Sequence, residues 1–407
     1  MYRKIFSSLA VSVFIKLISF IASIVIARSL GVEGRGELAI ILAVYGVAVL
    51  IGNFGFIDSF LVFLKERKKD ISGSMLFIWC YSLSAGIVVG LIAFLYVWHT
   101  QSNRDMHITM MIYAISCPIA IFTALMLNVA IIKEETKIFN ISRAMQGVLY
   151  VIFVLSFSVY YLNVRLVIVS LLLSLLISAS YLYYMLRAKH SKNLSVVLNR
   201  SRLLEYVRGC GKLSVSNFMI TFTYGLSSLL PIFYLSTFSN LSTVGVYSVS
   251  FNLICLGVSL IMPSMAIITA ANNDKFSVKN LILITCFLSI IGVIVAYYSA
   301  DIFFEVVYGA SFNKAGQVFT FLVPYAFLLI SAQILSAILR GASRASLAAA
   351  CCIGSLLISV IILFVATKSD VERVMAINIS LSIYSSLAFA LQAAAIIYIR
   401  RNNIICN

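Results

Sequence analysis

The chain has 407 residues, of which 62% are hydrophobic and 11% are charged, whereas a soluble domain averages roughly 45–50% apolar and about 25% charged residues. A soluble fold could not hide so much apolar surface from water, so the composition excludes one; a bilayer is itself an apolar solvent. The net charge of +16 does not indicate nucleic-acid binding, because the basic residues are scattered among short loops.

Twelve apolar runs are long enough to cross a bilayer, which takes roughly 20 residues at about 1.5 Å each. The fifth run is short, and its division from the sixth, near Asn163, is the least sharply marked. We therefore predict an all-α integral membrane protein with about twelve transmembrane helices. In chain order the predicted spans are 5–27, 38–64, 74–98, 108–132, 144–161, 166–186, 212–235, 244–269, 280–298, 317–339, 344–366 and 376–399.

The Lys and Arg residues predict the orientation in the membrane. With the N-terminus in the cytoplasm, the connecting segments on that side hold 22 of the 30 basic residues, including Arg143, and those on the other side hold seven. The remaining one, Lys16, lies within the first span. Positive charge collects on the cytoplasmic side of short loops, so both termini are predicted to be cytoplasmic.

A basic segment near the midpoint divides the chain into two lobes. We predict an N-terminal lobe over 1–186 with helices 1–6, a basic cytoplasmic linker over 187–211, and a C-terminal lobe over 212–407 with helices 7–12. Six helices per lobe leave both lobes in the same orientation, so the sequence predicts a parallel pseudo-repeat. Shifting the first half by 209 residues places Gly36 on Gly245, at the entries to helices 2 and 8.

Polar residues form a stripe along one face of helix 1 and another along helix 7. A spacing of three and four residues keeps each set on a single helical face, and the 209-residue shift superposes several members. Such stripes either pack between helices or line a polar cavity, and we favour a central cavity. The stripes comprise Ser8, Ser12, Lys16, Ser19 and Ser23 in helix 1, and Ser214, Asn217, Thr221, Tyr224 and Ser228 in helix 7.

Two charged residues are predicted within the membrane, where a charge costs roughly 2.5–3.5 kcal/mol on insertion scales. Lys16 lies near the middle of helix 1 on its polar stripe, and we assign it to the cavity, where a cation suits an anionic group such as pyrophosphate. Asp58, in helix 2, is a candidate for carrying a coupling ion, or else a structural partner of Lys16. Arg28 and Arg340 end helices 1 and 10 and either contact phosphate or extend to lipid headgroups.

Enzyme signatures are largely missing. No His lies at metal-ligand spacing from a second His or Cys, and no Walker lysine follows a Gly-rich run. We therefore expect no cofactor and no metal, and transport driven by a proton or sodium gradient, a substrate gradient or a partner.

Several short segments resemble those of O-antigen and polysaccharide flippases, the polysaccharide transporter branch of the multidrug/oligosaccharidyl-lipid/polysaccharide exporter superfamily. One departure is that 227–231 (SSLLP) lacks the acidic residue that relatives often carry in helix 7. The similar segments are 27–31 (ARSLG), 34–36 (GRG), 53–55 (NFG), 244–248 (VGVYS), 308–315 (YGASFNKA) and 339–341 (LRG).

This resemblance implies two six-helix lobes around a cationic cavity, and a flippase that moves undecaprenyl-pyrophosphate-linked oligosaccharide from the cytoplasmic to the periplasmic leaflet of the bacterial inner membrane. It implies lipid-linked glycan and membrane lipids as partners, together with a polysaccharide polymerase and a chain-length regulator. The competing hypotheses are a multidrug or peptidoglycan-precursor transporter of the same superfamily and a membrane-embedded transferase or polymerase.

Overall fold

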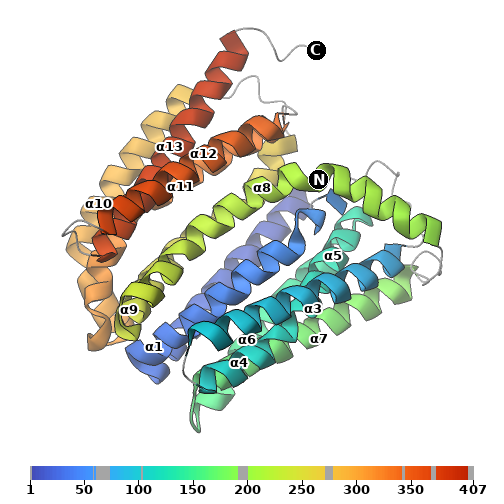
Figure 1. Cartoon of the computed structure of the whole chain (residues 1–407), viewed down its shortest axis with the longest axis horizontal. Coiled ribbons are helices and arrows are strands. Elements are labelled where there is room, and N and C mark those ends of the chain that lie inside the picture. Colours follow the sequence, from blue (N-terminus) through green and yellow to red (C-terminus); the bar gives the residue numbers. More distant parts are fainter. Residues whose placement is uncertain are drawn as a thin grey trace. The chain divides into compact units, whose positions relative to one another are not determined.

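The computed structural model describes residues 2–57, 59–60, 74–101, 104–190, 200–270, 278–341, 344–367 and 373–401, and the elements in this part of the chain are helical (Figure 1). A spanning helix pairs its backbone groups internally, which the hydrocarbon core requires. The helices are α1 (Tyr2–Asn53), α3 (Ser74–Thr100), α4 (Arg104–Ala114), α5 (Ser116–Ile132), α6 (Thr136–Ser158), α7 (Val164–His190), α8 (Arg200–Phe238), α9 (Leu241–Ala270), α10 (Val278–Tyr308), the short 3-10 helix η2 (Ala310–Phe312), α11 (Lys314–Gly341), α12 (Ala345–Thr367) and α13 (Arg373–Arg401).

Eleven stretches of the described residues are long and apolar enough to cross a membrane, and one of them is long enough to cross twice. Residues Ala10–Asn53 form a single stretch of 44 residues, which at 1.5 Å per residue is about twice the roughly 30 Å of a hydrocarbon core. Within it, Gly31 leaves helical geometry, with φ 67° and ψ −172°. Glycine adopts positive φ without strain, so α1 divides there into the first and second predicted spans. The prediction of about twelve transmembrane helices is confirmed.

The fourth predicted span consists of two helices, because proline interrupts it. Pro118 has no backbone N–H to donate to the carbonyl of Ala114, four residues earlier, and α4 ends at Ala114 while α5 begins at Ser116. The uncertain boundary between the fifth and sixth spans is also settled, since α6 ends at Ser158 and α7 begins at Val164.

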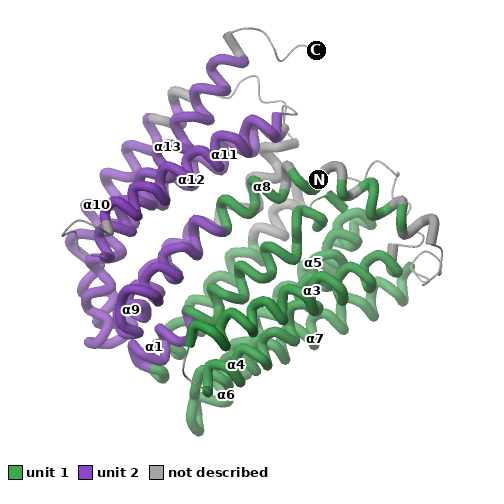
Figure 2. The backbone as a smooth tube through the Cα atoms, viewed as in Figure 1, with its two compact units in different colours: residues 1–30, 40–225 green, residues 31–39, 226–407 purple. Residues whose placement is uncertain are grey.

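The chain contains two compact units (Figure 2). Unit 1 comprises residues 1–30 and 40–225, and unit 2 comprises 31–39 and 226–407. The chain therefore passes from unit 1 to unit 2 at Gly31 in α1, returns to unit 1 at Ile40, and enters unit 2 again after Gly225 in α8. Of the predicted linker, 187–190 belong to α7 and 200–211 to α8, while 191–199 lie outside the described residues. The lobe boundaries at 186 and 212 stay a prediction.

Each unit has a core of its own. In unit 1 the ring of Phe77 stacks on those of Phe60 and Tyr206, with centroids 5.5 and 5.7 Å apart, and Phe60 and Tyr206 are tilted to each other at 6.1 Å. All three side chains are buried. In unit 2 the Ser250 hydroxyl of α9 donates to the backbone carbonyl of Ala315 in α11 at 2.6 Å. In a bilayer the hydrophobic effect does not drive helices together, because lipid tails are as apolar as the side chains. Close packing, including aromatic contacts, and interhelical hydrogen bonds hold the helices together instead.

The helix-entry glycines of the two halves pack reciprocally within unit 2. A side chain at Gly36 would collide with the backbone of Leu241, and one at Gly245 would collide with the backbone of Val32. A shift of 209 residues superposes Val32 on Leu241 and Gly36 on Gly245. The contact of Gly36 with Leu241 therefore has its counterpart in the contact of Gly245 with Val32. Reciprocal contact of this kind is what a two-fold relation produces, so the structure confirms the predicted pseudo-repeat and its register.

A second pair of contacts shows the same repeat between other helices. In unit 1, Gly86 of α3 lies against Pro118 of α5, and in unit 2, Gly292 of α10 lies against Val323 of α11, next to Pro324. The two glycines are 206 residues apart, and so are the two prolines. The α3–α5 and α10–α11 pairs are therefore equivalent.

Candidate functional site

A cationic site within unit 1 is formed where α6 packs against α1. Arg143, in the second turn of α6, donates a long hydrogen bond of 3.4 Å from Nη1 to Oγ of Ser12, and its guanidinium lies 5.2 Å from the ring centroid of Phe139. One turn further along α6, Gly147 allows close approach to Ile15, the neighbour of Lys16. Among the described residues, no carboxylate lies within ion-pair distance of Arg143. We define the α1–α6 cationic face as Ser12, Lys16 and Arg143.

Arg143 corrects the sequence analysis, which counted it as a cytoplasmic loop charge. The predicted fifth span began at residue 144, but α6 begins at Thr136, so Arg143 lies within the helix and is half-buried. The signal that could have revealed it is the run from Ile138 to Ile141, in which apolar residues already recur at helical spacing. The hydropathy pattern therefore predicted too late a start for this helix, because its first turns contain polar residues.

The candidate site residues of the first span, within α1, differ in how exposed they are. Ser12 is buried with 2% exposure, Lys16 is half-buried, and Ser19, also half-buried, donates from Oγ to the carbonyl of Ile15 at 2.8 Å. Arg28 is exposed near the end of the first span. The structure thus brings Ser12 to Arg143 and places Lys16 one turn beyond Ser12 on the same helical face. The Ser19 hydroxyl instead bonds to its own helix, as serines in membrane helices commonly do.

The helix 7 candidates lie in α8. Thr221, Tyr224 and Ser228 are half-buried at a spacing that keeps them on one helical face. Asn217 lies in the same helix, but its side chain, like the whole of Asp58, is outside the described residues. Whether this stripe binds substrate and whether Asp58 carries an ion stay predictions.

Arg340 lies in the last turn of α11 in unit 2 and is half-buried. Its Nε is buried without a hydrogen-bond partner among the described residues, as are Oε1 of Gln333 and Oγ of Ser336. Steps of three and four residues place all three on one face of α11. A guanidinium at a helix C-terminus is favoured by the helix dipole, and its remaining hydrogen-bonding capacity suits an anion.

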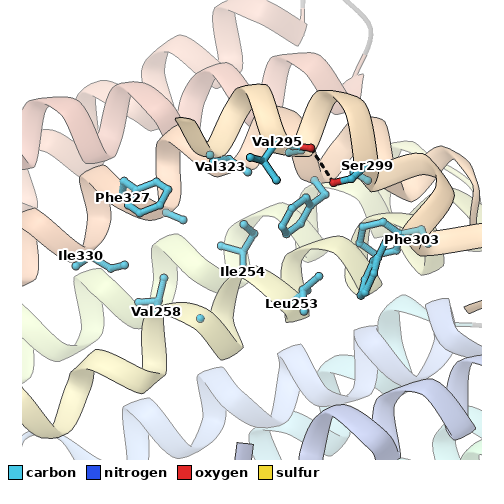
Figure 3. A pocket seen from close by; sticks show the side chains of 16 residues that line it. Leu253, Ile254, Val258, Val295, Ser299, Phe303, Val323, Phe327 and Ile330 are labelled. Atoms are coloured by element: carbon cyan, nitrogen blue, oxygen red, sulfur yellow. Dashed lines mark hydrogen bonds between the residues drawn. The ribbon is translucent and has the colours of Figure 1, made fainter. Parts of the chain in front are cut away.

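Unit 2 also contains an apolar pocket of about 680 Å³ between α9, α10 and α11 (Figure 3). Its walls include Ile254 and Val258 from α9, Val295 from α10 and Phe327 from α11. The Ser299 hydroxyl at its edge donates to the carbonyl of Val295 at 2.7 Å, which leaves the pocket lined by hydrocarbon. Such a pocket suits an apolar molecule and has little to offer a sugar or a phosphate.

Side chains fill the region of unit 1 that corresponds to this pocket. The repeat shifts carry Tyr45 and Tyr113 to Ile254 and Phe319, both of which line the pocket. In unit 1 the two tyrosine rings stack with centroids 3.8 Å apart, and Gly52 lies in close contact with Val89 and Ile121. The pocket therefore results from side-chain replacement in unit 2 and not from the helical framework that the two halves share.

Each unit by itself presents a cationic group in a membrane-spanning helix: the α1–α6 cationic face in unit 1, and Arg340 with its polar neighbours in unit 2. No group of three His, Cys, Asp or Glu side chains that could hold a metal ion occurs in the described ranges. The expectation of no cofactor is not tested by this arrangement.

The comparisons with known proteins agree with the fold. The structure is similar to a multidrug resistance MATE family transporter of the MOP superfamily in its inward-facing conformation, with a TM-score of 0.69, 13% sequence identity, and coverage of 98% of this chain and 99% of that one. The outward-facing conformation of a transporter of the same description matches with a TM-score of 0.62, 14% identity, and coverage of 98% and 95%. A eukaryotic MATE transporter matches with a TM-score of 0.63, 12% identity, and coverage of 97% and 95%.

No curated protein matches the sequence. A family model described as polysaccharide biosynthesis protein matches residues 1–269, about two thirds of the 407-residue chain, and this confirms the family that the sequence motifs indicated. The chain therefore belongs to the polysaccharide biosynthesis protein family and has the fold of MOP-superfamily transporters.

Proposed function

We propose that the protein is a transporter that moves undecaprenyl-pyrophosphate-linked oligosaccharide across the bacterial inner membrane. The observation that carries the proposal is the α1–α6 cationic face, where Arg143 lies half-buried in a spanning helix with no described carboxylate at ion-pair distance. Charged groups within a membrane bundle are costly and usually functional. A pyrophosphate would supply the missing counter-charge.

The chemistry of such a substrate fits a helical membrane protein. The lipid tail is soluble in the hydrocarbon, so the protein needs to shelter only the pyrophosphate and the glycan. Lys16 and Arg143 would hold the pyrophosphate together with the hydroxyl of Ser12, which Arg143 contacts. Thr221 and Ser228 of α8 are further candidates for contacts with the polar part of the substrate. Alternating exposure of these faces to the two sides of the membrane would complete the transfer, driven by a proton or sodium gradient.

The test is the lipid-linked glycan pool in cells that lack the protein. We expect the pool to accumulate in the cytoplasmic leaflet, with loss of surface polysaccharide, because the glycan cannot cross the hydrocarbon unaided. Re-expression of the wild-type chain should restore both. Unchanged surface polysaccharide and an unchanged pool, in cells without a second flippase, would reject the proposal.

A second candidate is a multidrug transporter, and the apolar pocket of unit 2 favours it. A pocket of about 680 Å³ lined by hydrocarbon is within the size range of small-molecule sites, and the similar solved structures include multidrug resistance transporters. The same deletion cells separate the two functions. Increased sensitivity to apolar cations with an unchanged glycan pool would favour drug export.

A further inference from the structure

A small groove of unit 2, distinct from the apolar pocket, combines polar and aromatic groups. Asn378, Ser382 and Ser386 follow one another at intervals of four residues along α13 and therefore share a face. With Phe321 of α11 they line a cavity of about 250 Å³, whose remaining walls are Met375, Ile379 and Ile383.

Asn378 is the unusual member of this groove. Its side chain is only 4% exposed, and neither Oδ1 nor Nδ2 has a hydrogen-bond partner among the described residues. Leaving a buried amide unpaired costs roughly 1–3 kcal/mol per group, which is why native structures satisfy nearly all such groups. An amide offers two donors and an acceptor, so its missing partner is a group that both donates and accepts.

A neighbouring polar side chain of α13 does have a hydrogen-bond partner, so the missing partner is particular to Asn378. Ser380, two residues from Asn378, donates to the carbonyl of Ser359 in α12 at 2.9 Å, and the two hydroxyls lie 2.9 Å apart. The polar group of α13 that faces α12 at this level is thus paired within the protein. The face that lines the groove presents Asn378 without a protein partner.

Phe321 adds an apolar platform beside these polar groups. Its ring is 57% exposed although it lines the groove. A sugar ring has hydroxyl groups around its edge and C–H groups on its faces, so it requires hydrogen-bonding groups on one side and an apolar surface on another. A lipid chain would leave Asn378 unpaired, and a hard cation requires about six oxygen ligands, which this groove does not gather.

We propose that the groove formed by Phe321, Asn378, Ser382 and Ser386 is a subsite for one sugar ring of the transported glycan. This inference rests on the proposed function and deepens it. The Asn378 amide and the Ser382 hydroxyl bond the sugar hydroxyls. The Ser386 hydroxyl, which donates to the carbonyl of Ser382 at 2.7 Å, accepts a further hydrogen bond. The exposed phenylalanine ring covers a C–H face. The groove would therefore distinguish a lipid that carries a glycan from one that does not.

The experiment compares two probes on purified full-length protein in lipid nanodiscs. The first is the lipid-linked glycan extracted from cells lacking the protein, and the second is undecaprenyl pyrophosphate. We expect wild-type protein to bind the glycan-bearing probe about tenfold more tightly, since two or three additional hydrogen bonds of modest net strength give a factor of that order. Asn378→Leu should bind both probes equally, at the affinity of the glycan-free probe.

Two further variants control for misfolding and for nonspecific effects of substitution. Phe321→Leu changes an exposed side chain, so it should fold normally and still reduce the preference for glycan. Ser359→Ala is the control, because it removes a hydrogen bond of α13 outside the groove and should leave the preference intact. If wild-type protein prefers the glycan-bearing probe and both groove variants keep that preference, the subsite is rejected while the proposed function stands. If no glycan-bearing lipid accumulates, or wild-type protein binds neither probe, the proposed function itself fails.

Discussion

At the scale of single residues, Arg143 makes two contacts that are specific to a guanidinium. Its guanidinium reaches Ser12 on the neighbouring helix and lies over the ring of Phe139, so both its charge and its planar shape are used. Arginine binds phosphate through paired hydrogen bonds that lysine cannot reproduce. The two basic residues of the α1–α6 cationic face should therefore differ in how they respond to substitution.

Replacing Arg143 by alanine should abolish glycan transport, and Arg143→Lys should retain a fraction of it because the charge remains. The measurement is surface polysaccharide in deletion cells that express each variant at equal membrane level. Lys137→Ala is the matched control, since Lys137 lies on the same helix but is exposed. Wild-type transport by Arg143→Ala would remove this residue from the site.

Lys16→Ala should abolish export while membrane insertion stays normal. Lys16 is half-buried in a helix whose insertion is helped by losing a charge, so the variant should reach the membrane at least as well as the wild type. Quantitative membrane immunoblots report insertion, and the leaflet distribution of lipid-linked glycan reports transport. Export at the wild-type rate would show that Lys16 serves packing or pairing alone.

At the scale of elements, glycines determine how closely helices approach. Gly36→Ala should lower the free energy of unfolding by about 1–3 kcal/mol, the usual cost of overpacking, because its new methyl group would meet the backbone of Leu241. Thermal unfolding in detergent measures the effect. Gly354→Ala in α12 is the control: nothing lies within 4 Å of the added carbon, so the change should be neutral or stabilising by up to about 1 kcal/mol. Equal effects at both positions would contradict the close crossing.

The contact between the start of α6 and the end of α7 should respond to acid. Glu135, between the membrane-spanning segments, accepts a hydrogen bond from Lys189 Nζ at 2.6 Å and lies 3.2 Å from Nε2 of His190. The hydrogen bond from Lys189 lowers the pKa of the Glu135 carboxyl from its ordinary 4.5. A lowered folded-state pKa means stabilisation that is present above pH 4.5 and is lost as the pH falls through the lowered value.

Glu135→Gln should therefore be less stable than the wild type at neutral pH and equally stable at low pH. Melting temperatures of the two proteins measured at a series of pH values below 7 test this. Because Lys189 is well exposed, the difference should be small and should shrink further at high salt. Parallel pH profiles for the two proteins would show that the ion pair contributes nothing.

Hydropathy was enough to predict the membrane-spanning segments, because an apolar run of about 20 residues has few alternatives in a bilayer. The break at Pro118 and the early start of α6 were not predicted. The repeat register was predictable, since a shift of 209 residues superposes Gly36 on Gly245 and several members of the polar stripes. The cationic face was predicted only in part: Lys16 and Ser12 were marked by their stripe, but Arg143 lies in a polar helix start that resembles a loop. Asn378 could not be predicted, since only three-dimensional packing shows that its amide lacks partners.

At the scale of the whole molecule, the predicted even number of crossings would place both termini on the same side of the membrane. The excess of Lys and Arg in alternate loops predicts that this side is cytoplasmic. Reporter fusions after residue 407 and before residue 1 should both be active only as cytoplasmic reporters. A fusion at residue 103, between α3 and α4, should give the opposite result. Opposite signals from the two termini would require an odd number of spans.

The reciprocal crossing of Gly36 with Leu241 and Gly245 with Val32 has a meaning for ancestry. A contact that maps onto itself when the halves are exchanged is the contact that two identical subunits make across a two-fold axis. A chain of half this length, with one such glycine, could form the same crossing with a second copy of itself. The reciprocal crossing is therefore the contact expected of a chain that arose by duplication and fusion of such a half. The equivalent regions of the two halves now differ, with stacked tyrosines in one and a pocket in the other.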